Sequence, residues 1–248
     1  MDVALGLFAF WPALALGSFL NVVAARVPLR RSVVRPASAC MSCGHELAWY
    51  DNVPVASWLW LRGRCRSCGT GISARYPAVE LATAALVAAC FVKFGLSGEA
   101  FLAAFFCVVL VVLSAIDLEH RIVPNRIVLP AALVVLLAHT ALDPSPEWLL
   151  GALGASGFLL VAALVYPAGM GMGDVKLALL LGAMLGRVVG VGLMLGMLAA
   201  LVPSVYLLAR HGSAARKMGI PFAPFLALGA VIALFAGHSL LDAYLSHF

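Results

Sequence analysis

The chain has 248 residues, of which 64% are hydrophobic and only 11% are charged, and its formal net charge is +5. Soluble domains carry about 25% charged residues, so this composition excludes an ordinary water-exposed globular surface. It predicts instead a chain whose outer surface is covered largely by lipid, which raises the question of how often it crosses the bilayer.

Long apolar segments recur along the chain. A helix that crosses a bilayer needs about 20 largely apolar residues. The candidates are 3–25, 76–92, 100–116, 127–142, 148–173, 188–209 and 218–241. A further segment, 177–186, reaches only about 15 Å as a helix, which predicts a short span or a re-entrant segment. The sequence therefore predicts an all-α polytopic membrane helical bundle with seven to eight spans.

The arrangement of basic residues predicts the orientation of these spans. Cytoplasmic loops of membrane proteins carry an excess of Lys and Arg. With the N-terminus outside and eight spans, only Lys93 and Arg187 fall on the outer side. The inner side holds Arg26, Arg30, Arg31, Arg35, Arg62, Arg64, Arg66, Arg75, Arg121, Arg126, Lys176, Arg210, Arg216 and Lys217. This asymmetry explains the positive charge without a nucleic-acid partner, and membrane lipid is the expected surrounding.

The first apolar run, 3–25, has no basic segment before it and is long enough to span the bilayer. We therefore expect a retained helix and not a removable signal peptide. The following polar stretch, 26–75, contains four of the six cysteines. Three parts are predicted: a first transmembrane helix at 1–25, a cytoplasmic zinc domain with four cysteine ligands at 26–77 and a membrane-embedded bundle at 78–248.

The cysteines of the polar stretch form two C-x-x-C pairs, Cys40 with Cys43 and Cys65 with Cys68. Two such turns can supply the four sulfurs of a tetrahedral zinc site. A disulfide or a redox pair is the alternative, but thiols on the expected cytoplasmic side stay reduced. We expect structural zinc, since so small a segment cannot bury enough apolar area to fold alone.

Two acidic residues are expected at the cytoplasmic membrane face. Asp117 ends one apolar run, and Asp174 follows Gly171 and Gly173 between two others. Ionisable groups at membrane depth are costly, which makes them candidates for function. Two carboxylates brought together can share one proton, so that one activates a water while the other protonates a leaving amine. This is the chemistry of an aspartic protease.

The residues around the two aspartates suit such a site. Gly171 and Gly173 permit close approach of the backbone beside Asp174, and Pro124 breaks the helix after Asp117. The alternative is that both aspartates only mark helix boundaries, with Asp174 as a helix N-cap.

Six motifs in order resemble those of the type IV prepilin peptidases, which are membrane aspartic proteases of the GxGD type. They are Gly17–Val23 with Arg26–Pro28, the paired C-x-x-C segment, Arg75–Glu80, Asp117–Asn125, Gly171–Lys176 and Ile220–Phe225. Ala223 stands in the last motif where glycine is usual in the family. The resemblance covers nearly the whole chain.

The resemblance implies a multi-pass protein of the bacterial inner membrane whose active site faces the cytoplasm. Asp117 and Asp174 are then the catalytic residues, and Gly171, Gly173, Lys176, Pro124 and Asn125 support the catalytic loops. The implied substrates are prepilins or pseudopilins, whose basic leader is removed. The resemblance also implies methylation of the new N-terminus with S-adenosylmethionine.

Three alternatives remain open at this point. The first is a leader peptidase without methyltransferase activity. The second is an ion or proton transporter, which predicts polar residues throughout the spans, whereas here the middles of the spans are apolar. The third is a zinc-knuckle membrane adaptor without catalysis, which leaves the segment around Asp174 unexplained.

Overall fold

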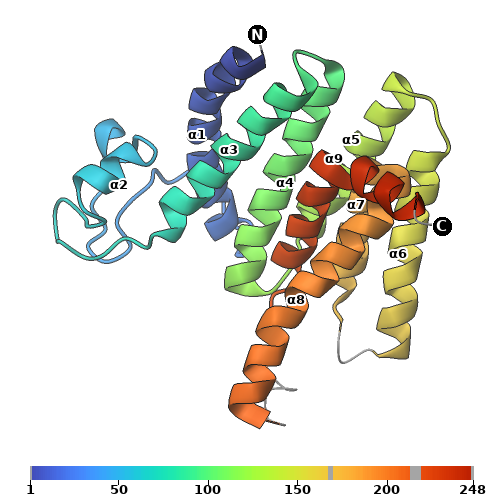
Figure 1. The fold of residues 1–248 in the computed structure, drawn as a ribbon. Helices are drawn as coiled ribbons and strands as arrows, with labels where there is room; N and C mark the ends of the chain where they lie inside the picture. The colour runs from blue at the N-terminus through green and yellow to red at the C-terminus, as the bar shows by residue number, and fades with distance from the viewer. Residues whose placement is uncertain (1, 167–169, 213–218, 247–248) are drawn as a thin grey trace. The chain divides into compact units, whose positions relative to one another are not determined.

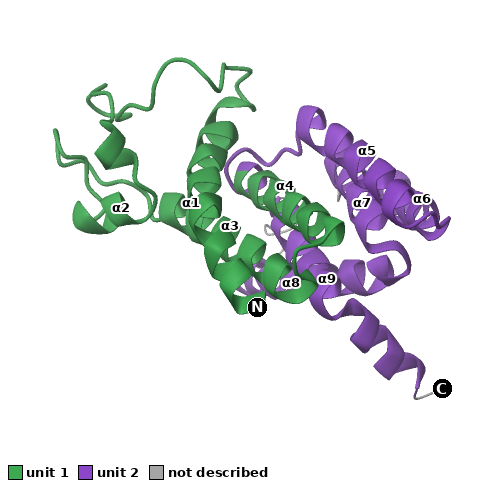
Figure 2. Cartoon of the chain, turned by 90° about the horizontal axis from the view of Figure 1, so that it is seen from above, with its two compact units in different colours: residues 1–115 green, residues 116–248 purple. Residues whose placement is uncertain are grey.

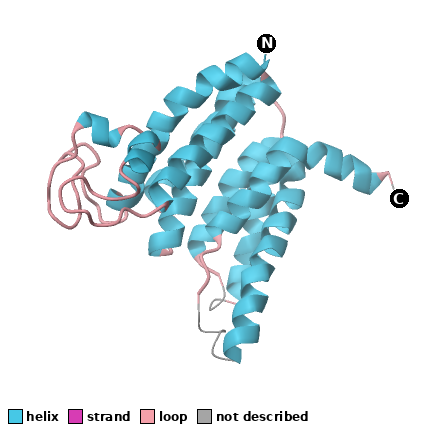
Figure 3. Cartoon of the chain, turned by 60° about the vertical axis from the view of Figure 1, so that its left-hand side comes forward, coloured by secondary structure: helices cyan, strands magenta, loops and turns pink. Residues whose placement is uncertain are grey.

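A computed structural model describes residues 2–166, 170–212 and 219–246, and almost all of their regular structure is helical (Figures 1 and 3). Within these ranges there is no β-strand, and the only extended pairings are two isolated bridges, Ala39 with Glu46 and Arg64 with Gly71. Both bridges lie in residues 27–74, which contain the two C-x-x-C pairs and are called the cysteine-containing segment. The prediction of an all-α protein is confirmed.

The described helices follow the predicted apolar segments closely. The long ones are α1 (Asp2–Arg26), α3 (Arg75–Phe94), α4 (Gly98–His120), α5 (Asn125–Leu142), α6 (Glu147–Val165), α7 (Met172–Leu185), α8 (Val189–His211) and α9 (Ala223–Leu245). The short ones are η1 (Trp49–Asn52), α2 (Ala56–Trp60) and η2 (Gly186–Val188). Seven helical segments in the described ranges are long and apolar enough to cross a membrane, with Met172–His211 taken as one of them. The chain is a multi-pass membrane protein.

The helix boundaries near the short apolar segment 177–186 differ from those predicted from the sequence. Helix α6 ends at Val165, although the apolar run continues to residue 173. Helix α7 then begins at Met172 and therefore includes Asp174. With 14 residues it extends about 21 Å, which is shorter than the hydrocarbon core of about 30 Å. The segment predicted as a short span is thus the greater part of a short helix.

The chain divides into two compact units, residues 1–115 and 116–248 (Figure 2). In unit 1, α1 packs along α3, and the side-chain amide of Asn21 donates to the carbonyl of Tyr76 at 3.1 Å. The cysteine-containing segment connects these two helices. Residues of α1, α3 and this segment therefore surround common space within unit 1.

In unit 2, α6 packs against α7, and α8 packs against α9. Gly151 near the start of α6 lies against Gly182 near the end of α7, and a Cβ on Gly182 would overlap the Gly151 carbonyl. Small residues let membrane helices approach closely enough for extensive van der Waals contact. The pair therefore allows a close approach between the start of α6 and the end of α7.

Candidate active site and metal cluster

Asp117 lies one turn before the end of α4 and is buried, with 5% of its surface exposed. Its Oδ2 accepts a hydrogen bond of 3.0 Å from the backbone N–H of Ala223, the first residue of α9. The first N–H groups of a helix have no partner inside the helix, and this end of the helix favours negative charge. The start of α9 therefore fixes the position of the Asp117 carboxylate.

Asp174 lies in the first turn of α7, and its backbone N–H donates to the carbonyl of Gly171 at 3.1 Å. The N-cap of α7 is Gly171, in an extended conformation, so Asp174 is not the N-cap itself. Asp117 lies near enough to interact electrostatically with Asp174. The structure thus places the two carboxylates within electrostatic range of each other in unit 2.

The segment between α4 and α5 belongs to the same candidate site. Arg121 adopts a φ of +54°, and its N–H donates to the carbonyl of Asp117 at 2.9 Å, which ends α4. Pro124 follows as the N-cap of α5. A Cβ on Gly173 would lie 3.0 Å from the Cβ of Val123, so glycine allows the start of α7 to approach this segment. A Cβ on Gly171 would meet only ordinary contacts.

Lys176 in the second turn of α7 and Asn125 at the start of α5 are in direct contact. The Lys176 Nζ donates to the Asn125 Oδ1 at 2.9 Å, although the two residues are 51 positions apart in the chain. This bond links the helix that carries Asp174 to the helix that follows Asp117.

Chemically, this site in unit 2 offers two carboxylates within electrostatic range of each other and an adjacent helix N-terminus. Two carboxylates in one site can act as general base and general acid when one is ionised and the other is protonated. Such a pair can hydrolyse an amide bond. The segment 121–124, which lies beside Gly173, is itself not helical.

The four cysteines of the C-x-x-C pairs form a cluster in unit 1. Their sulfur atoms all lie within 4.8 Å of one another, and the Sγ atoms of Cys40 and Cys68 are 3.8 Å apart. Tetrahedral zinc with Zn–S bonds of about 2.3 Å places its sulfurs about 3.8 Å apart. The cluster therefore fits a metal ion such as zinc.

The local backbone explains why the cysteines converge. In each pair the N–H of a following glycine donates to the first cysteine's carbonyl at 2.9 Å, from Gly44 to Cys40 and from Gly69 to Cys65. Both glycines have a φ of +72°, a conformation that side chains disfavour. Hydrogen bonds with Thr70 lower the pKa of Cys68 to about 6.

Comparison with known proteins places the chain in a family. Residues 12–94 match the bacterial peptidase A24 N-terminal domain, and residues 104–237 match the type IV leader peptidase family. The second match contains Asp117, Asp174 and Ala223, and the first contains the four cysteines. The chain belongs to the type IV leader peptidase family.

Curated relatives from several bacteria carry the name prepilin leader peptidase/N-methyltransferase. The protein of Bacillus subtilis is 37% identical over 249 residues, which cover 96% of each chain. That of Burkholderia pseudomallei is 36% identical, over 93% of this chain and 85% of the relative. That of Myxococcus xanthus is 44% identical over 82% of this chain, but the match spans only 63% of the relative. No solved structure matches the chain significantly.

Proposed function

We propose that the chain is a membrane aspartic endopeptidase that removes the basic leader of type IV prepilins or pseudopilins. The observation that carries this proposal is that Asp117, held by the start of α9, and Asp174 lie within electrostatic range of each other in unit 2. Both residues lie in the part of the chain that matches the leader peptidase family. The substrate class follows from the names of the relatives.

In this proposal the two aspartates share the work of hydrolysis. The ionised carboxylate takes a proton from water, and the water oxygen attacks the carbonyl carbon of the scissile bond. The protonated carboxylic acid then donates its proton to the leaving nitrogen as the C–N bond breaks. Ala223 fixes Asp117, while Gly171, Gly173, Lys176, Pro124 and Asn125 keep the surrounding loops in position.

The remaining parts of the chain receive matching roles. We propose residues 1–25 as a membrane helix, 26–77 as a domain stabilised by structural zinc on Cys40, Cys43, Cys65 and Cys68, and 78–248 as the peptidase bundle. The protein resides in a bacterial cytoplasmic (inner) membrane with its active site towards the cytoplasm. The mature part of a prepilin substrate is apolar and can lie among lipid and helices.

The relatives' name, which includes N-methyltransferase, also supports a second activity. We propose that the chain methylates the new N-terminus with S-adenosylmethionine. In that reaction the bond from the methyl carbon to sulfur breaks, a bond to the amine nitrogen forms, and the amine loses a proton. The donor leaves as S-adenosylhomocysteine. A leader peptidase without this activity is the alternative.

One experiment tests both activities. Purified protein in lipid nanodiscs is incubated with a prepilin and S-adenosylmethionine, and the product is analysed by mass spectrometry. We expect a product that lacks the leader and whose first residue is heavier by one CH2 group. A cleaved but unmethylated product would establish the peptidase alone, and an intact prepilin would contradict the proposed function.

The proposed orientation makes a separate prediction. A cysteine introduced at Ser145, in the loop between α5 and α6, should react with an impermeant maleimide on intact spheroplasts. A cysteine at His211, at the end of α8, should react only after permeabilisation, because basic residues gather on the cytoplasmic side. The parent chain without either substitution reports labelling of the native cysteines. The opposite labelling pattern would place both aspartates on the outer face.

A further inference from the structure

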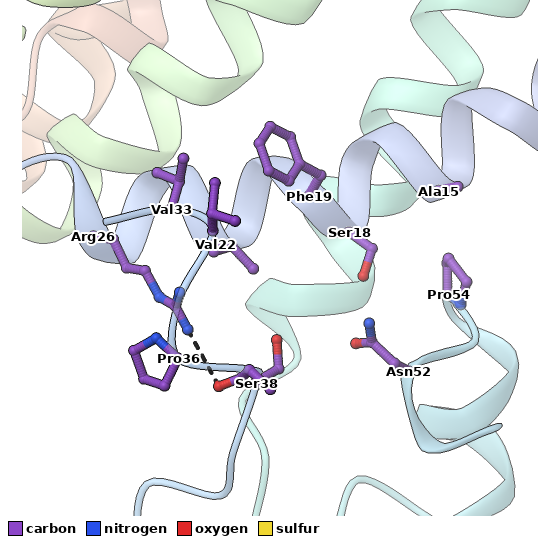
Figure 4. A pocket seen from close by; sticks show the side chains of 12 residues that line it. Ala15, Ser18, Phe19, Val22, Arg26, Val33, Pro36, Ser38, Asn52 and Pro54 are labelled. Atoms are coloured by element: carbon purple, nitrogen blue, oxygen red, sulfur yellow. Dashed lines mark hydrogen bonds between the residues drawn. The ribbon is translucent and has the colours of Figure 1, made fainter. Parts of the chain in front are cut away.

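A cavity of about 300 Å³ lies in unit 1 between the cysteine-containing segment and helices α1 and α3. Ser18 and Asn21 of α1, Trp58 of α2, and Tyr76 and Glu80 of α3 contribute to its walls. A neighbouring pocket of about 320 Å³ shares residues with it, Ser18 among them (Figure 4). Sites for small molecules have volumes of about 300–1,000 Å³. The cavity is therefore large enough for a small organic ligand.

Glu80 places a buried carboxylate in the wall of this cavity. It is 7% exposed, and its Oε2 accepts a hydrogen bond of 2.7 Å from the backbone N–H of Val55. Among the described residues, no Lys, Arg or His side chain forms an ion pair with it. Buried carboxylates are normally paired with a positive charge. Glu80 therefore places in the cavity a carboxyl group that has no basic partner among the described residues and with which a cationic ligand can pair.

The other carboxylate of the cavity is different. Asp51 is bound at two points by the guanidinium of Arg66, with its Oδ1 2.7 Å from Nη2 and its Oδ2 3.1 Å from Nε. Its charge is thus neutralised within the protein. Of the two acidic side chains in the described wall, Glu80 alone lacks a basic partner. It is therefore the one that can pair with a positively charged group of a ligand.

The walls around Glu80 are held in place by further bonds. The indole N–H of Trp58 donates to the carbonyl of Ile72 at 3.0 Å, which fixes an aromatic ring in the wall. Val55 has a φ of +59°, a conformation rare for a β-branched residue. Such a conformation persists only where the surroundings determine it. The bond from Val55 to Glu80 is one such constraint, so the shape of the cavity and the position of the carboxylate are coupled.

We propose that this cavity binds S-adenosylmethionine and that Glu80 is the counter-charge for the ligand's sulfonium group. The ligand combines an aromatic base, a polar ribose and a permanent positive charge, and the cavity offers an aromatic wall, polar side chains and an unpaired carboxylate. A Lys or Arg of the substrate's leader could also pair with Glu80, but it would leave the aromatic wall unused. The inference rests on the proposed methyltransferase function.

The test compares two ligands that differ in the charge on sulfur. Affinities of S-adenosylmethionine and of the uncharged S-adenosylhomocysteine are measured by isothermal titration calorimetry on the purified full chain. Glu80→Gln should weaken S-adenosylmethionine binding by about tenfold or more, because loss of one partner of a buried charge pair costs at least that much. The affinity for S-adenosylhomocysteine should change far less.

Two controls keep the test decisive. Glu46→Gln removes an exposed carboxylate of the same segment and should leave both affinities unchanged. Metal content and the melting temperature establish whether Glu80→Gln is folded. In the wild-type chain, hydrogen exchange should show that S-adenosylmethionine protects the amides of residues 53–58 and 72–80, a result that depends on no variant.

The outcomes separate this inference from the function on which it rests. Wild-type protein that binds neither ligand would contradict the methyltransferase function itself. If the wild-type chain binds both ligands, two results would overturn only the assignment of this cavity. One is unchanged S-adenosylmethionine affinity in folded Glu80→Gln, and the other is hydrogen-exchange protection confined to other residues. Loss of leader-peptide affinity in Glu80→Gln, with S-adenosylmethionine affinity intact, would assign the cavity to the basic leader.

Discussion

Replacing either Asp117 or Asp174 by Asn is expected to abolish leader cleavage. An amide keeps the size of the side chain and can still accept the hydrogen bond from Ala223, so the variants should fold. It can neither take a proton from water nor donate one as a carboxylic acid. Loss of general acid–base catalysis costs about 10²–10⁴-fold in rate. Initial rates of leader removal from a purified prepilin measure the effect.

The double variant distinguishes a catalytic pair from two independent residues. Members of one catalytic unit are not additive, so Asp117→Asn combined with Asp174→Asn should be no slower than either single variant. Asp→Glu at either position should also strongly slow leader cleavage. The added methylene displaces the carboxylate by about 1 Å, and a displacement of that size can lower the rate about 100-fold. Asp143→Asn, which changes an exposed carboxylate in the same unit, is the matched control. A multiplied loss in the double variant would contradict a shared mechanism.

Replacing Cys65 by Ser should remove the metal from the cysteine cluster. Cys65 is the buried member, at 5% exposed, and it supplies one of the four sulfurs of the cluster. Structural zinc contributes about 10–16 kcal/mol to folding in zinc-finger peptides. Zinc content should fall from about one ion per chain to none, and residues 40–70 should become sensitive to protease while the membrane helices persist.

Elemental analysis and limited proteolysis measure this result. Ser42→Ala alters an exposed residue within the first C-x-x-C turn without removing a sulfur, and it should keep the metal. A wild-type protein without zinc, or one with a native disulfide between Cys40 and Cys43, would contradict the metal assignment.

The sequence predicts most of the membrane helices well, because the length of an apolar run determines whether a helix can cross the bilayer. It failed at the end of α6, where hydropathy continues but the helix stops at Val165. Tyr166 precedes a proline in the sequence, and the residue before proline is disfavoured in a helix. Hydropathy does not register this steric effect. It also placed the start of α7 too late, because the charges of Asp174 and Lys176 interrupt the apolar run while the helix continues through them.

The metal cluster was also predictable, since C-x-x-C spacing brings two sulfurs together within each turn. Contacts between segments that are distant in the chain could not be predicted from the sequence. The donor to Asp117 is the backbone N–H of Ala223, 106 residues away, and a backbone group leaves no signal in the residue type. The bond from Val55 to Glu80 is of the same kind. In the sequence, only the resemblance to a family motif distinguishes the segment Ile220–Phe225.

The most direct test of the central claim is the rate at which purified Asp174→Asn removes a prepilin leader in a single turnover. Asp143→Asn and the wild-type chain are measured beside it, and metal content and melting temperature verify that all three are folded. The two-aspartate mechanism predicts cleavage by wild type and Asp143→Asn, and none detectable by Asp174→Asn. Cleavage by folded Asp174→Asn at close to the wild-type rate would contradict it.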